Sequence, residues 1–109
     1  MAVDLTCTIG GITITPCLMN APGAGGLGGV ELDALSRSGV GAVVTPPIAR
    51  QPQPTPPAPY YHEFHGGSLR SPGLGVVSQE EAATLLDLAR QDGKPVMACI
   101  SAAVAEDFA

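Results

Sequence analysis

The sequence predicts an α/β fold with a parallel sheet and right-handed crossovers. Three observations support this prediction: short apolar runs end at Gly or Pro, amphipathic segments with helical spacing lie between them, and the two kinds of segment alternate along the chain. The chain has 109 residues. This length predicts one small domain over residues 1–109, or a piece of a larger one, and is too short for a complete (β/α)8 barrel, which needs about 250 residues.

The first predicted element is a hairpin between Val3 and Ile14. Two short β-branched runs flank Gly10-Gly11, a dipeptide that supplies the positive φ angles of a two-residue turn. Further along the chain, apolar runs are bounded by Gly or Pro, a pattern typical of strands buried on both faces. Three such strands are predicted: Cys17–Ala21, Ala42–Thr45 and Val96–Ile100.

Two helices are predicted between these strands. The first spans Glu31–Ser38, where Asp33 and Arg37 can form an ion pair at i,i+4. In the second, Ser78 and Glu81 form a capping box ahead of four apolar positions with helical spacing, and a glycine ends the helix. The acidic, Ala-rich C-terminus is predicted to begin a further helix.

The charge balance excludes several function classes. Ten acidic residues outnumber five basic ones, the net charge is −5, and no run of Lys or Arg is present to follow a nucleic-acid backbone. No apolar stretch reaches the roughly 18 residues of a membrane span, and an acid near the start differs from the basic start of a secretory signal. We therefore expect a cytoplasmic protein that binds neither nucleic acid nor membrane.

The low share of charged residues, 14%, leaves little polar cover for two sheet faces. The predicted edge strands are apolar and carry no internal Lys or Pro that would block pairing with another chain. We therefore expect a complementary chain or a homo-oligomer. The three cysteines, Cys7, Cys17 and Cys99, form no CxxC pair and are expected to be reduced and buried inside strands, with metal ligation as the weaker alternative.

Two short motifs carry candidate chemistry. Gly23–Gly28 satisfies GxGxxG between a predicted strand and a helix, but the acidic residue that a dinucleotide site needs about 20 residues later is absent. His62 and His65 flank Glu63 without a second ligand cluster elsewhere, so we interpret them as partly exposed loop histidines. No Ser-His-Asp or Cys-His grouping can be assembled, and no catalytic or metal-binding residue is assigned.

A long loop is predicted over residues 46–77. Its Pro-rich part, Gln51–Pro59, suits neither a helix nor a β ladder and is expected to be extended and exposed. Tyr60-Tyr61 are expected to pack this loop onto the sheet.

Three segments share the order and spacing of motifs from one enzyme family. Thr15–Gly23 is similar to an "NP-x-x-M-N-A-S-G" opening, Pro57–Tyr61 stands in the place of "P-x-P-R-Y", and Gly67–Leu74 stands in the place of "GS-I-N-S-M-G-L". In this order they resemble the class 1 dihydroorotate dehydrogenases. The resemblance extends over essentially the whole chain and covers the first third of the family's sequence.

The resemblance implies the N-terminal portion of a (β/α)8 barrel, consisting of a hairpin and about three βα units, with the barrel incomplete. It also implies a flavoprotein of pyrimidine biosynthesis, an oxidoreductase in which FMN takes a hydride from dihydroorotate to give orotate. The residues that it implies for FMN are Ala21, Pro22, Gly23 and Thr45, and those for the substrate are Arg70, Gly73 and Leu74.

Several positions depart from the family pattern. Pro46 replaces a Lys that contacts flavin and substrate, Arg70 replaces an Asn, and Pro72 replaces a Met whose N–H can donate to the substrate. The family's catalytic base and phosphate loops lie beyond residue 109. We therefore expect a dihydroorotate dehydrogenase-like chain that does not catalyse the reaction alone. The alternatives are a non-catalytic remnant or subunit that acts through protein contacts, and a small dinucleotide-binding module built on GxGxxG.

Overall fold

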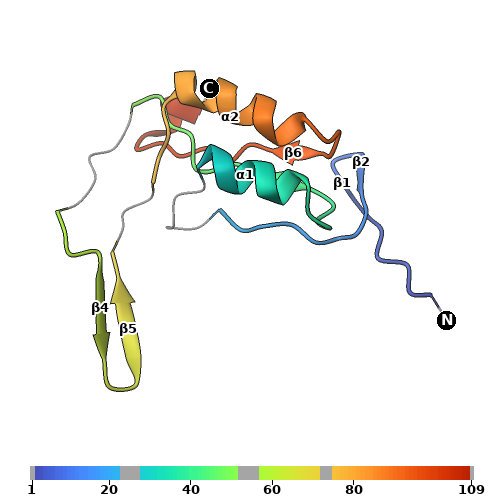
Figure 1. Ribbon diagram of the computed structural model, residues 1–109. Helices are drawn as coiled ribbons and strands as arrows, with labels where there is room; N and C mark the ends of the chain where they lie inside the picture. The colour runs from blue at the N-terminus through green and yellow to red at the C-terminus, as the bar shows by residue number, and fades with distance from the viewer. Residues whose placement is uncertain (1, 23–27, 52–56, 72–74, 109) are drawn as a thin grey trace.

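The computed structural model describes residues 2–22, 28–51, 57–71 and 75–108. Within these residues the chain is a small α/β structure with short strands and two α-helices, and it forms no closed barrel (Figure 1). The elements in chain order are β1 (Cys7–Ile9), β2 (Ile12–Ile14), α1 (Gly29–Ser36), β3 (Val43–Val44), β4 (Tyr61–Phe64), β5 (Gly67–Arg70), α2 (Gln79–Arg90), β6 (Val96–Met97) and a 3-10 turn (Ala105–Phe108).

The predicted N-terminal hairpin is confirmed as the antiparallel pair β1–β2. Gly10 and Gly11 form its turn with φ angles of 56° and 79°, which is the left-handed region that the dipeptide was expected to supply. Ile14 at the end of β2 is fully buried, whereas Ile9 and Ile12 beside the turn are about half exposed. The hairpin is therefore anchored to the body at one end only.

Three segments run parallel, side by side and in chain order. The strand β3 lies between the segment around Met19 and the segment that contains β6. Both neighbouring connections carry a helix, as the βαβ pattern requires. The parallel partners are Met19 with Ala42, Val43 with Val96, Val44 with Met97, and Ile48 with Ile100.

Of the three predicted strands, only the central one is buried as expected. Residues 41–47 are all buried. At 17–21 no continuous strand forms: Met19 makes a single bridge, and Cys17 and Leu18 are exposed because no strand in the described part of the chain covers their outer side. At 96–100 the strand β6 is only half buried and ends at Met97, after which Ile100 makes one further bridge.

Helices α1 and α2 pack against each other on one side of the three parallel segments (Figure 1). The core beneath them centres on Leu32 from α1, Val43 from β3 and Ala89 from α2, all fully buried. Four half-buried apolar residues surround this centre: Leu35, Val40, Leu85 and Val96.

The helix ends follow local side-chain chemistry. The Ser78 hydroxyl accepts a hydrogen bond from the Glu81 N–H at 3.2 Å, so the predicted cap of α2 is confirmed. The predicted ion pair between Asp33 and Arg37 is present at 3.0 Å. Helix α1 ends at Ser36 and not at Ser38, because the Ser38 hydroxyl donates to the Leu35 carbonyl in place of a further helical turn. The predicted C-terminal helix is present as a short 3-10 turn.

The prediction of a plain loop over 46–77 is wrong. Strands β4 and β5 form an antiparallel hairpin in which Tyr61 pairs with Arg70 and Phe64 with Gly67. The turn between the strands contains Gly66 at φ 92°, a value that suits glycine. Every residue of the two strands is exposed, and Figure 1 shows the hairpin projecting away from the helices. Tyr60 and Tyr61 therefore do not pack the segment onto the sheet.

The excursion that carries this hairpin is closed at its base. The Val77 N–H donates to the Pro47 carbonyl at 2.9 Å, and the Ala49 N–H donates to the Val77 carbonyl at 3.1 Å. Most of the Pro-rich segment, residues 52–56, lies outside the described residues. The described residues on either side of it, Gln51 and Pro57, are exposed as predicted.

The cysteine expectations hold only in part. All three cysteines are free. Cys7 lies in β1 and is half buried, Cys99 is half buried but follows the end of β6, and Cys17 is exposed in the first parallel segment.

Neither described helix is long and apolar enough to cross a membrane.

Candidate functional site

The carboxyl ends of the three parallel segments meet at one edge of the sheet, which is where open α/β folds place their ligand sites. Asn20, Thr45 and Cys99 lie at this edge, one on each segment. Their side chains and main-chain groups hold the three ends together.

Asn20 ties the first segment to β3. Its side-chain Nδ2 donates to the Val44 carbonyl at 2.8 Å, and its Oδ1 accepts from the Val44 N–H at 2.7 Å. The carboxamide thus takes the place of a neighbouring main chain, and it supports the turn that begins at Ala21. Sequence reasoning assigned no role to Asn20, although an Asn that directly ends an apolar run was a usable signal.

Thr45 ties β3 to the third segment. Its N–H donates to the Met97 carbonyl at 2.9 Å, and its hydroxyl oxygen accepts from the Cys99 N–H at 3.0 Å. Thr45 is only 1% exposed. The Thr45 hydroxyl can still donate its hydrogen to a further acceptor, but the hydrogen bond that the structure shows for it is made within the protein.

The turn that follows the first segment is open to solvent. Ala21 and Pro22 are both exposed, and Gly23, the third residue implied for this turn, lies outside the described residues. Small exposed side chains at a strand end leave room for a flat ring to approach the backbone. The backbone at Ala21 and Pro22 is therefore accessible from solvent.

Among the described residues, the two that directly follow Thr45 carry no charge. Pro46 and Pro47 are both buried, and neither has an N–H or a charge. The first cation after β3 is Arg50, whose Nη1 lies 3.3 Å from the Asp107 Oδ1. This end of the sheet offers a ligand few polar groups.

Arg70, the residue implied for substrate, lies on the β4–β5 hairpin. Within the described residues no hydrogen bond or ion pair joins it to Ala21, Pro22 or Thr45. The structure therefore places Arg70 on a different segment from Ala21, Pro22 and Thr45. The other two residues implied for substrate, Gly73 and Leu74, lie outside the described residues.

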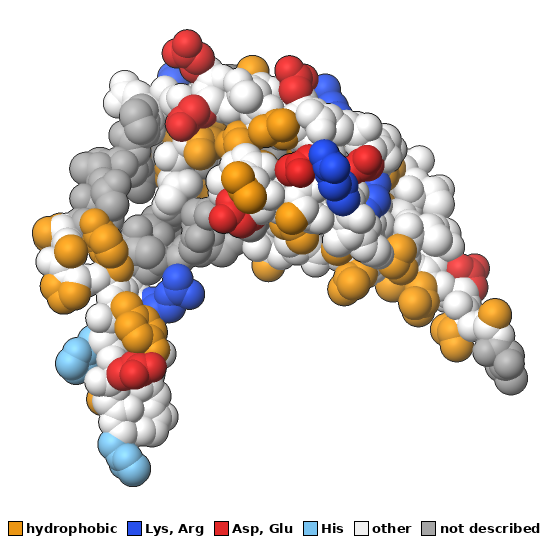
Figure 2. Space-filling model, viewed as in Figure 1, with side chains coloured by type: hydrophobic (Ala, Val, Ile, Leu, Met, Phe, Trp, Pro, Cys, Tyr) orange, Lys and Arg blue, Asp and Glu red, His pale blue; other side chains and the backbone are white. Residues whose placement is uncertain are grey.

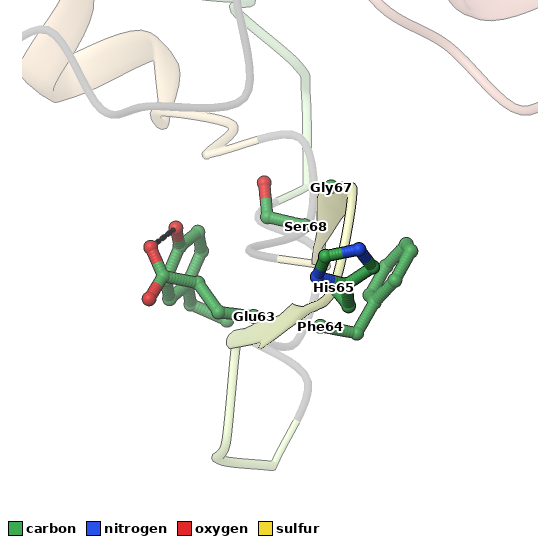
Figure 3. Close-up of a pocket in the computed structure, with 6 residues that line it drawn as sticks. Glu63, Phe64, His65, Gly67 and Ser68 are labelled. Atoms are coloured by element: carbon green, nitrogen blue, oxygen red, sulfur yellow. Dashed lines mark hydrogen bonds between the residues drawn. The ribbon is translucent and has the colours of Figure 1, made fainter.

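The hairpin carries a hollow of about 550 Å³ on its own surface (Figure 3). Its lining residues are Tyr61, Glu63, Phe64, His65, Gly67 and Ser68. Figure 3 shows Glu63 and Ser68 on one side of the hairpin, with Phe64 and His65 on the other. Because all of these residues are exposed, the hollow is a surface feature and not an enclosed ligand site.

The two motifs of candidate chemistry receive little support. His62 belongs to β4 and not to a loop, and in the described part of the chain no three His, Cys, Asp or Glu residues gather as metal ligands. Of the GxGxxG segment, only Gly28 is described, where it precedes α1 without a side-chain cap.

Comparison with known proteins points to one enzyme. The chain is 35% identical, over 106 residues and 97% of its length, to the protein named "Dihydroorotate dehydrogenase B (NAD(+)), catalytic subunit" from Methanocella arvoryzae (strain DSM 22066 / NBRC 105507 / MRE50). The match covers 35% of that protein, so the chain spans about a third of the length of this relative. No family model matches the chain.

Proposed function

Because the chain belongs to the class 1 dihydroorotate dehydrogenase family, we propose that it forms the first strand–helix units of a (β/α)8 barrel that oxidises dihydroorotate to orotate. The unit is one partial domain over residues 1–109, with the Pro-rich excursion of residues 46–77 inside it. The chain supplies part of the site and does not catalyse the reaction alone.

The order of the parallel segments is the observation that supports this proposal most directly. Three neighbouring segments follow one another in chain order with the two helices on one side. A (β/α)8 barrel consists of eight strand–helix units that follow one another in the same way. A doubly wound sheet would place its helices on both faces. The same order leaves an open edge on each side of the described sheet.

FMN is the cofactor of the proposed reaction and accepts the hydride when it is bound. Ala21, Pro22 and Gly23 would line one side of its ring, and Thr45 would fix the strand end beneath it. On the hairpin, Arg70 would bind the carboxylate of dihydroorotate or orotate through its guanidinium, while Gly73 and Leu74 would shape the pocket.

The partner in this proposal is a polypeptide that supplies the remaining strands. At the third segment, the main-chain groups of residues 99 and 101 bond to Ile48, which follows β3 in the chain: the Ile48 N–H donates to the Cys99 carbonyl at 2.8 Å and the Ser101 N–H donates to the Ile48 carbonyl at 2.9 Å. In a strand, successive main-chain groups alternate in direction, so those of Ile100 face the open edge. The Ile100 side chain is 57% exposed.

The experiment combines the purified chain with FMN and a polypeptide matching the remaining two thirds of the Methanocella arvoryzae subunit. We expect the two polypeptides to copurify, to retain flavin absorbance after dialysis and to convert dihydroorotate to orotate. The chain alone should lose FMN, because it offers the cofactor few contacts.

The matched control is Ile100→Pro, which removes an outward N–H and no hydrogen bond found in this structure. This variant should keep its helical content yet fail to copurify. A chain that retains stoichiometric flavin alone, or a pair that never associates, would refute the proposed assembly.

A second candidate is a non-catalytic subunit that acts through protein contacts. The specific observation in its favour is buried, uncharged Pro46 where the family carries a Lys. Copurification without flavin retention or orotate formation would favour this candidate.

A further inference from the structure

The β4–β5 hairpin has two chemically different faces. Cross-strand partners in an antiparallel pair project from the same side, so the register places four polar residues together on one face. They are Tyr61, Glu63, Ser68 and Arg70. The other face carries His62, Phe64 and Leu69.

On the polar face, Glu63 and Arg70 have opposite charges and lie at diagonal positions. Glu63 pairs directly with Ser68, two residues before Arg70. Diagonal neighbours are about 7–8 Å apart at the backbone, within reach of two long side chains. An ion pair between them would occupy the Arg70 guanidinium with the protein's own carboxylate.

The structure shows a different partner for Glu63. The Tyr61 hydroxyl donates to the Glu63 Oε1 at 2.6 Å (Figure 3). In the described residues no ion pair joins Glu63 to Arg70. Tyr61 stands directly across from Arg70. The Glu63 carboxylate is therefore bound to the side chain of the residue that pairs with Arg70.

We propose that Tyr61 is a positioning residue that keeps Glu63 off Arg70, so that the Arg70 guanidinium stays available for the carboxylate of a ligand. The inference rests on the proposed function for its ligand, an anionic substrate. Under this inference, the Glu63 carboxylate and the carboxylate of the ligand compete for the Arg70 guanidinium. Removal of the phenol hydroxyl releases Glu63, which then pairs with Arg70.

The first experiment measures the availability of Arg70 without any ligand. The intact chain is treated with phenylglyoxal at low salt, and modification of each arginine is followed by peptide mass spectrometry. Arg90, for which the described residues provide no ion-pair partner, is the internal reference. We expect Tyr61→Phe to slow modification of Arg70 by about twofold to fivefold, the range of an exposed ion pair.

Two further variants separate this effect from a change in hairpin structure. The double variant Tyr61→Phe with Glu63→Gln should restore the original rate, because the released side chain no longer carries a charge. Ser68→Ala, on the same face, should leave the rate unchanged. An unchanged rate in Tyr61→Phe, or a slow rate that persists in the double variant, would overturn the inference.

The second experiment titrates orotate into the chain assembled with its complementary polypeptide. Binding that is weakened about twofold to fivefold in Tyr61→Phe and restored in the double variant supports both proposals. If orotate does not bind, but Tyr61→Phe slows modification of Arg70 and the double variant restores it, the proposed substrate is wrong and the proposed role of Tyr61 is supported.

Discussion

The carboxamide of Asn20 makes both hydrogen bonds that a neighbouring strand would otherwise make with the main chain of Val44. The first parallel segment therefore leaves the sheet at Asn20 without leaving the Val44 N–H or carbonyl unpaired. Because the Asn20 side chain replaces the main-chain hydrogen bonds of the next residue pair in the sheet, the backbone at Ala21 can turn away from β3. The open turn at the candidate flavin position thus depends on a single amide.

Replacement of Asn20 should destabilise the chain. Asn20→Ala leaves the buried N–H and carbonyl of Val44 without partners, at a cost of about 1–3 kcal/mol. Asn20→Asp keeps the acceptor but loses the donor and sets a negative charge against the Val44 carbonyl. Urea unfolding followed by circular dichroism should show both losses. Exposed Gln79→Ala is the control, and equal midpoints for Asn20→Ala and the control would contradict the role of the amide.

Gly41 should tolerate no side chain. A Cβ at this position would lie 1.9 Å from the Pro16 carbonyl oxygen and 2.8 Å from the Thr15 carbonyl carbon, both of which belong to the backbone. We expect Gly41→Ala to move the first segment off β3 and to lower the melting temperature strongly or to give insoluble protein. Gly39→Ala is a matched control, because a Cβ there meets nothing within 4 Å. Similar melting of the two variants would show that the close approach is not needed.

The cap of α2 should contribute measurably to stability. Ser78→Ala removes the acceptor for the Glu81 N–H and should cost about 1 kcal/mol. Ser78→Asp keeps an acceptor at the same position and adds a negative charge at the helix N-terminus, so its stability should match the parent or exceed it. Equal losses in both variants, measured by thermal unfolding, would rule out a capping effect.

Pro46→Lys should have opposite effects on the chain alone and on the proposed assembly with a complementary polypeptide. In the chain alone, a Lys at this buried position lacks a partner and should lower the free energy of unfolding. In the assembled species, the restored cation should strengthen orotate binding by roughly 1.5 to 3 kcal/mol, which calorimetry can measure. Pro46→Met, which removes the ring without adding charge, is the control. Orotate binding that stays unchanged in Pro46→Lys would show that the pocket no longer uses this position.

The elements that the sequence predicted well are those whose cause is local. The turn at Gly10-Gly11 and the cap at Ser78 each depend on residues within a few positions, so the pattern and the structure agree. The burial of Val43 was predictable for a related reason, because an apolar run between Gly and Pro signals a central strand.

The errors concern partners that are distant in sequence or not in the described sheet. Asn20 contacts Val44, which lies 24 positions away, and no local pattern announces such a bond. Cys17 was expected to be buried because its apolar run predicts a strand covered on both faces, but the residue is exposed. The β4–β5 hairpin was missed because the prolines before it predict an extended loop, although His65-Gly66 lies between two short runs that contain Tyr61, Phe64 and Leu69.

The base of the excursion at Pro47, Ala49 and Val77 has a consequence for how this chain can change. These main-chain hydrogen bonds close the excursion where it leaves the sheet. The entropic cost of closing a loop rises only slowly with the number of residues in the loop. The β4–β5 hairpin can therefore change in length and sequence while the sheet keeps its structure. We expect its sequence to be replaceable by grafting without redesign of the sheet or its two helices.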